Sequence, residues 1–182
     1  GESFGGAERV FGWSFYSQGA AEGRQVSADQ FIVAALCWFG DPEMADSSAS
    51  AWDKGERLAE LIKEERTLLI LDGLEPLQTP PPVETGVLKD PALKTLLREL
   101  ARHNPGLVVI STRLAVTDLR DMHNHSVVEV DLENLSPESG AEYLEFLKVD
   151  GTETEREEAA KDFGGHALAL TLLGSYLRVV HA

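Results

Sequence analysis

The stretch TLLILDGLEP, residues 67–76, constrains the fold of this chain more than any other part of the sequence. Its apolar residues run without interruption into Asp72, and Glu75 follows three positions later. A short run that is apolar at successive positions is typical of a strand in a parallel sheet with helices on both faces. The stretch therefore predicts a buried strand that places two carboxylates at the carboxyl edge of a sheet.

A second apolar run, LVVIST at residues 107–112, predicts another buried strand. Residues 90–103, between the two runs, carry strong helix signals. Asp90 is a typical N-cap, Pro91 suits the first helical position, and leucines repeat on one face. Strand, helix and strand in this order indicate an α/β domain with a parallel sheet.

Other segments extend the same alternation. The aromatic-rich run at residues 9–18 and a shorter run, SVVEVDL at 126–132, predict two further strands. The helical spacing of apolar residues predicts helices over 27–39 and 52–65. Residues 40–53 between these helices are small and polar and predict a mobile loop.

After residue 134 the pattern changes to helices alone. Three helices are predicted there, the first opened by the Ser-Pro pair at residue 136, and Gly164-Gly165 separates the last two. We therefore expect an α/β domain at residues 1–134 and a small helical subdomain at residues 135–182.

The formal net charge of −15, from 31 acids and 16 bases, limits the partners of the chain. Its average field would repel a nucleic-acid backbone and an anionic membrane surface, so we expect neither as a partner. Solubility is the simpler explanation for the excess of acids. No stretch reaches the roughly 18 consecutive apolar residues that a bilayer crossing needs.

The chain has one cysteine, Cys37, within the apolar run ALCWF. A single cysteine excludes an internal disulfide and any metal site that needs several cysteines. This usage is typical of a reducing compartment, and we expect a cytoplasmic protein. The apolar neighbours of Cys37 predict a buried, unreactive thiol.

Asp72 and Glu75 are residue types that suit phosphate chemistry at this spacing. Ligands of open α/β sheets bind at the carboxyl edge. Because Mg²⁺ takes carboxylate, water and phosphate oxygens, Asp72 is a candidate magnesium-binding residue. Glu75 is near enough to orient a water for attack on a terminal phosphate, which makes it a candidate catalytic base. The alternative is a strand that ends in solvated acids before a turn.

Two further segments carry candidate binding residues. Ser111, Thr112 and Arg113 follow an apolar run, and a guanidinium there can bind a phosphate through its planar fork. In FGGHALAL, residues 163–170, the first amides of the last helix and the His166 imidazole can face an anion or a purine ring. The alternatives are a surface arginine that starts a helix and a tight corner between two helices.

The order of these segments resembles the NB-ARC family of signalling NTPases, which belongs to the STAND class of P-loop ATPases. RVFGWSFYSQ is similar to the second strand of that family, LLILDGLE to its Walker B strand and VVISTR to its sensor strand. LENLSPESGAEYLEFL is similar to the motif that opens the first helical (ARC) subdomain, and GGHALAL to the Gly-Leu-Pro-Leu-Ala motif. The resemblance covers nearly the whole chain and implies a parallel-sheet P-loop NTPase fold.

The resemblance also implies roles for individual residues. Asp72 would hold Mg²⁺ through water, and Glu75 would be the catalytic base. Arg113 would sense the terminal phosphate, while His166 and Ala167 would lie beside the adenine and ribose. The residues implied in nucleotide binding are Ser111, Thr112, Arg113, Gly165, His166 and Ala167.

In this class bound ADP holds the domains closed, and exchange for ATP opens them and drives oligomerisation. Slow hydrolysis resets the switch. The resemblance therefore implies ATP or ADP and Mg²⁺ as cofactors. It further implies an N-terminal effector domain and a C-terminal repeat sensor as partners within the same polypeptide, together with self-association.

The sequence departs from the family pattern at two positions. The usual Walker B strand ends in two adjacent acids, whereas here Gly73 follows Asp72 and the second acid is Glu75. This spacing is closer to the NACHT branch of the class and bears on hydrolysis more than on binding. Ala167 replaces the proline of the Gly-Leu-Pro motif, so that stacking of His166 on the base would have to substitute for a rigid apolar contact. Both departures favour an alternative function, a non-catalytic interaction scaffold that keeps the fold.

The phosphate loop of the class ends in Gly-Lys-Ser or Gly-Lys-Thr, and the 182 residues contain neither. In the family this loop precedes the second strand, so we expect it upstream of Gly1. Without its amides and lysine the chain is predicted to bind nucleotide weakly or not at all, with negligible hydrolysis. The strand of that loop lies between the strands here predicted at 107–112 and 126–132. Either these two pair directly, or another chain fills the gap.

Overall fold

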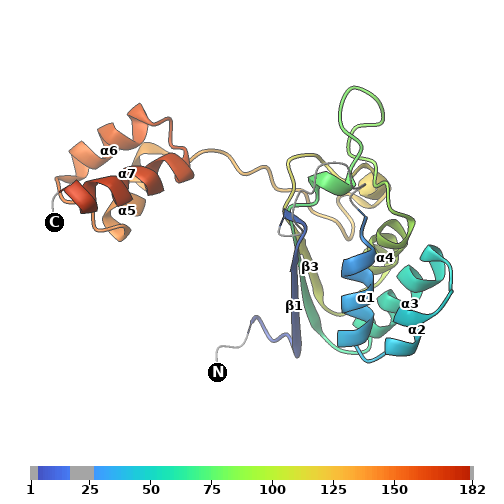
Figure 1. The fold of residues 1–182 in the computed structure, drawn as a ribbon. Helices are drawn as coiled ribbons and strands as arrows, with labels where there is room; N and C mark the ends of the chain where they lie inside the picture. Colours follow the sequence, from blue (N-terminus) through green and yellow to red (C-terminus); the bar gives the residue numbers. More distant parts are fainter. Residues whose placement is uncertain (1–3, 17–26, 181–182) are drawn as a thin grey trace. The chain divides into compact units, whose positions relative to one another are not determined.

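The chain divides into two compact units, Gly1–Glu129 and Val130–Ala182. The computed structural model describes residues 4–16 and 27–180. The first unit combines a sheet with helices, and the second is helical (Figure 1). Within the described ranges, no helix combines the length and the apolar character that crossing a membrane requires.

A three-stranded parallel sheet in the order β1-β2-β3 forms the centre of the first unit. β1 (Arg9–Ser14) pairs with β2 (Thr67–Asp72), and β2 pairs on its other side with β3 (Leu107–Ile110). Ser14 lies opposite Asp72 in this register. The predicted α/β class and parallel sheet are therefore confirmed, and the carboxyl ends of the three strands lie along one edge of the sheet.

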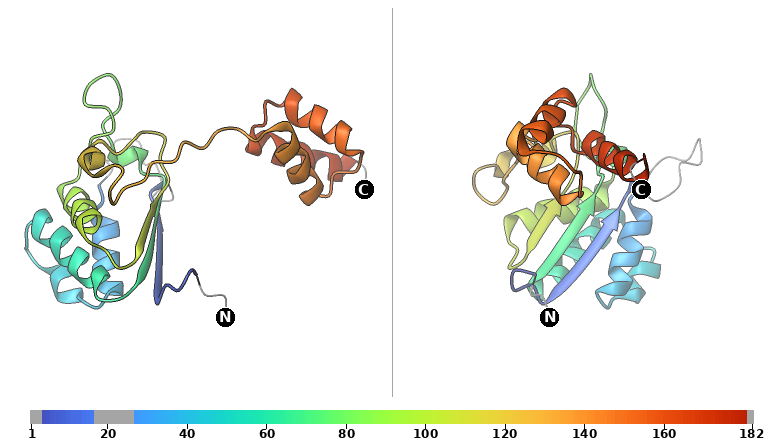
Figure 2. Two further views of the ribbon diagram at one scale, coloured as in Figure 1. Left: turned by 180° about the vertical axis from the view of Figure 1, so that it is seen from behind. Right: turned by 90° about the vertical axis from the view of Figure 1, so that its left-hand side faces the viewer.

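Three helices pack on one face of this sheet (Figures 1 and 2): α1 (Asp29–Trp38), α3 (Ala51–Lys63) and α4 (Pro91–Arg102). α3 begins with a capping box on Ser50, and the Asp90 side chain accepts a hydrogen bond from the Leu93 amide at the start of α4. These caps satisfy amides that have no partner within the helix; α4 begins where the sequence predicts, and α3 begins one residue earlier than predicted.

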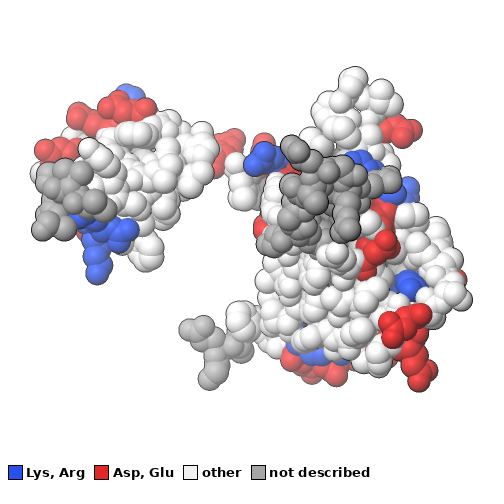
Figure 3. All heavy atoms as spheres, viewed as in Figure 1, with Lys and Arg blue, Asp and Glu red and all other residues white. Residues whose placement is uncertain are grey.

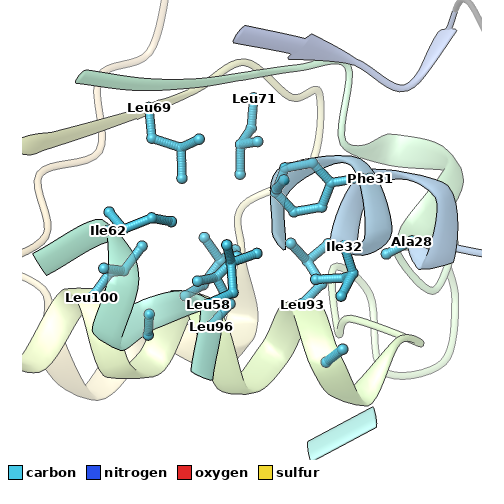
Figure 4. Close-up of a cluster of buried hydrophobic side chains, with 14 of the residues drawn as sticks. Ala28, Phe31, Ile32, Leu58, Ile62, Leu69, Leu71, Leu93, Leu96 and Leu100 are labelled. Atoms are coloured by element: carbon cyan, nitrogen blue, oxygen red, sulfur yellow. The ribbon is translucent and has the colours of Figure 1, made fainter. Parts of the chain in front are cut away.

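The core of the first unit lies between the sheet and these helices (Figure 4). Leu69 and Leu71 point from β2 into the helical layer, where Phe31, Leu58 and Leu96 belong to the same cluster. All five side chains are completely buried. Each contributes about 1.5–3 kcal/mol of hydrophobic stabilisation, and together they fix the position of β2 and hence of Asp72.

The opposite face of the sheet carries no helix from the described part of the first unit (Figure 2). Ile70, Leu107 and Val109 are 38%, 59% and 44% exposed. Parallel sheets are usually covered on both faces, and the apolar run of β2 predicts two covers. Among the described residues of the first unit, helices cover one face of the sheet and not the other.

The prediction of a strand at residues 126–132 is wrong. Only an isolated bridge between His123 and Val127 forms in this region. Three apolar side chains of the segment are 70–88% exposed: Val128, Val130 and Leu132. Alternation of apolar residues is not sufficient for a strand, which also needs the backbone groups of a neighbour. The direct pairing with residues 107–112 is therefore wrong too, whereas pairing of this region with another chain stays a prediction.

The segment 40–53, predicted as a mobile loop, contains the helix α2 (Pro42–Asp46). The Asp41 side chain accepts a hydrogen bond from the Met44 amide at 2.9 Å, and Pro42 occupies the first turn. Both features are ordinary signals of a helix start. The sequence analysis missed these signals because the surrounding residues are small and polar.

Cys37 is exposed, and the prediction of a buried thiol is wrong. It lies on the outer side of α1, whose inner side carries Phe31, Ile32, Ala35 and Leu36. Because a helix turns by about 100° per residue, apolar neighbours in sequence do not place a residue in the core.

The described residues of the second unit form three helices: α5 (Pro137–Phe146), α6 (Glu153–Asp162) and α7 (Ala167–Val180). Their core is small and centres on Leu144, Ala160 and Leu170. The three predicted helices are therefore confirmed. Both signs of charge reach the surface of each unit on the face drawn in Figure 3.

Candidate functional site

The candidate site is formed where the three strands end. Ser14 ends β1, Asp72 ends β2, and Ser111 directly follows β3. The Gly73 amide donates to the Ser111 carbonyl at 3.1 Å and to the Ser111 Oγ at 3.0 Å. These bonds extend the pairing of β2 and β3 by one step and bring the polar side chains of the strand ends together.

Asp72 accepts a hydroxyl hydrogen bond from each side. Ser111 Oγ donates to Oδ1 at 2.6 Å, and Ser14 Oγ donates to Oδ2 at 3.0 Å. These two bonds hold the pKa of the Asp72 carboxyl below its ordinary value, and the bond from Ser111 has the larger effect on the pKa. Asp72 is therefore an exposed, ionised carboxylate whose orientation is fixed by both neighbouring strands.

The Glu75 carboxylate also accepts two hydrogen bonds, one at each oxygen. Glu75 begins the short 3₁₀ helix η2 (Glu75–Leu77), and Tyr16 Oη donates to its Oε2 at 2.5 Å. The backbone amide of Arg113 donates to its Oε1, also at 2.5 Å. The hydrogen bond to Glu75 raises the pKa of the Tyr16 phenol, because the bond holds the phenolic proton in place.

Ser14 and Tyr16 are site residues that the sequence analysis missed. Both follow from the register: a strand that pairs in parallel with β2 must end beside Asp72, and Ser14 is the residue opposite. The two residues are separated by one position in the predicted strand at 9–18, so a common side could be predicted for them, but the register that brings them to Asp72 and Glu75 could not.

Arg113 and Thr112 differ in the groups that they use for hydrogen bonds within the chain. Arg113 is exposed, and the hydrogen bond that it donates to Glu75 comes from its backbone amide. Thr112 Oγ1 donates to Oε1 of the buried Gln78 at 2.6 Å. Thr112 thus connects the segment after β3 to the segment after η2, and its hydroxyl is occupied by that bond.

Gly165, His166 and Ala167 belong to the second unit. Gly165 has φ +66°, and a Cβ there would lie 2.0 Å from the Leu135 carbonyl oxygen, which explains the glycine. The His166 Nδ1 accepts a hydrogen bond from the Ala169 amide at 3.4 Å. These contacts cap α7 and form the corner between α6 and α7.

The residues at the sheet edge suit a magnesium ion that arrives with a phosphate. No group of three or more His, Cys, Asp or Glu that could hold a metal occurs in the part of the chain that the structure describes. Mg²⁺ commonly uses one or two carboxylates and takes its other ligands from water and phosphate. A single ionised Asp72 meets that requirement, and it does not meet the requirement of a metal held by protein ligands alone.

An open hollow of about 600 Å³ lies elsewhere on the first unit. It borders α4 and the 3₁₀ helix η3 (Thr117–Met122), and Lys94 there pairs with Asp118 at 2.6 Å. None of the residues predicted from the sequence lines it. The chemistry of the strand ends, and not the size of this hollow, therefore identifies the candidate site.

No family model, no curated protein and no solved structure matches the chain. Its function is therefore inferred from the residues at the edge of the sheet.

Proposed function

We propose that the chain is the nucleotide-binding switch region of a STAND-type signal-transduction ATPase, and that the sheet edge faces the phosphates of ADP or ATP. The observation that carries this proposal is the position of Asp72. It ends the central strand as an ionised carboxylate that Ser14 and Ser111 hold from both sides, and at the same edge Glu75 accepts a hydrogen bond from the Arg113 backbone amide. Ligands of open α/β sheets bind at this edge.

Each oriented group has a task in phosphate chemistry. A carboxylate oxygen can accept more than one hydrogen bond, so Asp72 can accept from a metal-bound water while it keeps its two serine donors. Bound Mg²⁺ would supply positive charge next to the phosphates. The Arg113 guanidinium would contact the terminal phosphate, and Glu75 would orient the attacking water.

A second candidate function is a non-catalytic interaction scaffold. It is favoured by the fact that both oxygens of Asp72 and both oxygens of Glu75 already accept hydrogen bonds from the chain. Such acids can act as internal ties between strand ends without any ligand. The two functions differ in whether nucleotide binding depends on this edge.

The Arg113→Ala substitution tests the proposed role of the guanidinium. Because the 182 residues contain no Gly-Lys-Ser or Gly-Lys-Thr, the experiment uses the full-length product of the gene. We expect the affinity for a non-hydrolysable ATP analogue to fall about tenfold, in line with the loss of one charge-assisted hydrogen bond. The affinity for ADP should change little, because ADP lacks the terminal phosphate. Calorimetric titration of both nucleotides measures this difference.

Arg120→Ala provides the matched control, since Arg120 is also exposed on the first unit but lines the hollow away from the strand ends. It should leave both affinities unchanged. An equal loss for ATP and ADP in the Arg113 variant would contradict the sensing role, and the absence of nucleotide binding in every form would favour the scaffold.

A further inference from the structure

Glu75 is held at both oxygens by groups that follow the two outer strands. The Tyr16 hydroxyl follows β1, and the Arg113 amide follows β3. Both hydrogen bonds are 2.5 Å long, a distance typical of a hydroxyl that donates to a carboxylate and shorter than a backbone amide usually makes. A carboxylate held in this way cannot rotate unless it gives up one of the two donors. Its direction is therefore set by Tyr16 and Arg113 together.

Tyr16 also occupies the space beside Gly73. A Cβ at Gly73 would lie 2.2 Å from both Cδ2 and Cε2 of the Tyr16 ring, far closer than two carbon atoms can approach. Gly73 has φ +70°, a conformation that glycine adopts without cost and other residues adopt with strain. The aromatic ring therefore lies directly over the backbone that joins Asp72 to the turn before Glu75.

We propose that Tyr16 is a positioning residue of the candidate site: its ring covers Gly73, and its hydroxyl, with the Arg113 amide, sets the direction of the Glu75 carboxylate. Any side chain at position 73 must displace this ring and so release Glu75. Together with the positive φ of Gly73, the Tyr16 ring disfavours an acid directly after Asp72, and the second acid of the site stands at position 75.

The first test is amide hydrogen exchange of this chain measured by NMR. Tyr16→Phe keeps the ring and removes only the hydroxyl. Because Tyr16 acts on Arg113 through Glu75, the Arg113 amide should exchange roughly tenfold faster, the size expected for loss of one hydrogen bond of ordinary strength. The Glu75 carboxyl ¹³C resonance should move as well. The amides of β2 and β3 should keep their exchange rates, which separates positioning from a general loss of stability.

The matched control is Tyr176→Phe, which removes the same hydroxyl from an exposed tyrosine of α7 in the second unit. It should change neither the Arg113 amide nor the Glu75 resonance. If Tyr16→Phe also leaves both signals unchanged, the hydroxyl does not position Glu75 and the proposal is overturned.

The second test is a double-mutant cycle on the stability of the chain. Gly73→Ala should lower the urea midpoint more in the presence of Tyr16 than in the Tyr16→Ala background. The strain from the positive φ is the same in both backgrounds and cancels in the comparison, so only the contact with the ring remains. Equal shifts in the two backgrounds would show that the ring does not occupy this space and would overturn the proposal.

This inference rests on the proposed function for the role that it gives to Glu75, the orientation of a water. Neither test involves a nucleotide. A failed nucleotide titration with a positive exchange result would therefore contradict the proposed function and support the positioning role of Tyr16. Nucleotide binding with an unchanged exchange rate would support the proposed function and contradict the positioning role.

Discussion

Replacing Gly55 with alanine is expected to destabilise the first unit by about 1–3 kcal/mol, the usual cost of overfilling a packed interior. In most helices the same substitution stabilises by up to about 1 kcal/mol, because alanine has the higher helix propensity. Here Gly55 lies inside α3, where a Cβ would be 2.2 Å from the backbone carbonyl oxygen of Ala92 in α4. A backbone oxygen cannot rotate away, so the two helices would have to separate.

Urea unfolding followed by tryptophan fluorescence measures this effect, because Trp13, Trp38 and Trp52 all belong to the first unit. Glu56→Ala, at the next and exposed position of α3, is the control and should change the midpoint little. A stability equal to or above that of the unaltered chain in Gly55→Ala would show that α3 and α4 do not approach as closely as the structure has them.

Replacing Asp72 with asparagine is expected to remove most of the magnesium dependence of nucleotide binding, measured on the full-length product of the gene. Losses of roughly 10- to 100-fold in metal affinity are typical when a group that holds or orients a metal ligand is lost. Asparagine keeps the shape of the side chain and can still bond to Ser14 and Ser111, so the fold should persist. Titration of ADP with and without Mg²⁺ measures the change.

Asp29→Asn is the matched control, since Asp29 is an exposed aspartate in the first turn of α1 and away from the strand ends. It should leave the magnesium dependence intact. Should Asp72→Asn bind ADP with an unchanged magnesium response, Asp72 would be a tie between strand ends and not a part of the metal site.

The sequence was sufficient to predict the elements whose signals are local. The N-cap Asp90 with Pro91 and the N-cap Ser136 with Pro137 each start a helix in the predicted place. The apolar run at 67–72 became the central strand, because its residues need burial that a sheet under helices supplies. Local propensity and tertiary packing agree in these segments.

The errors occurred where structure depends on contacts between distant segments. The segment 126–132 alternates like a strand but lacks a neighbour along its length within the described residues. Cys37 has apolar sequence neighbours but lies on the outer side of its helix. The notable gain from the structure is Tyr16, whose contacts with Gly73 and Glu75 depend on strand register and could not be obtained from spacing.

The candidate site, like the fold, could be predicted from the sequence only in part. The positions of Asp72, Glu75, Ser111 and Arg113 at one sheet edge could be predicted from the rule that parallel strands end together. The hydrogen bonds that orient them could not, because they depend on side chains from separate strands meeting within 3 Å of each other. The predicted role of Thr112 in binding has least support, since its hydroxyl is bonded to Gln78.

The central claim is that the edge containing Asp72 belongs to a nucleotide site. Titration of a fluorescent ADP analogue, with and without Mg²⁺, into this chain and into the full-length product of its gene tests it most directly. We predict a millimolar or weaker dissociation constant for this chain and a micromolar or tighter one for the full-length product, because the amides and lysine of a phosphate loop provide most phosphate contacts in this class. Micromolar binding by this chain alone would contradict the predicted need for a phosphate loop, and no binding by either form would contradict the claim.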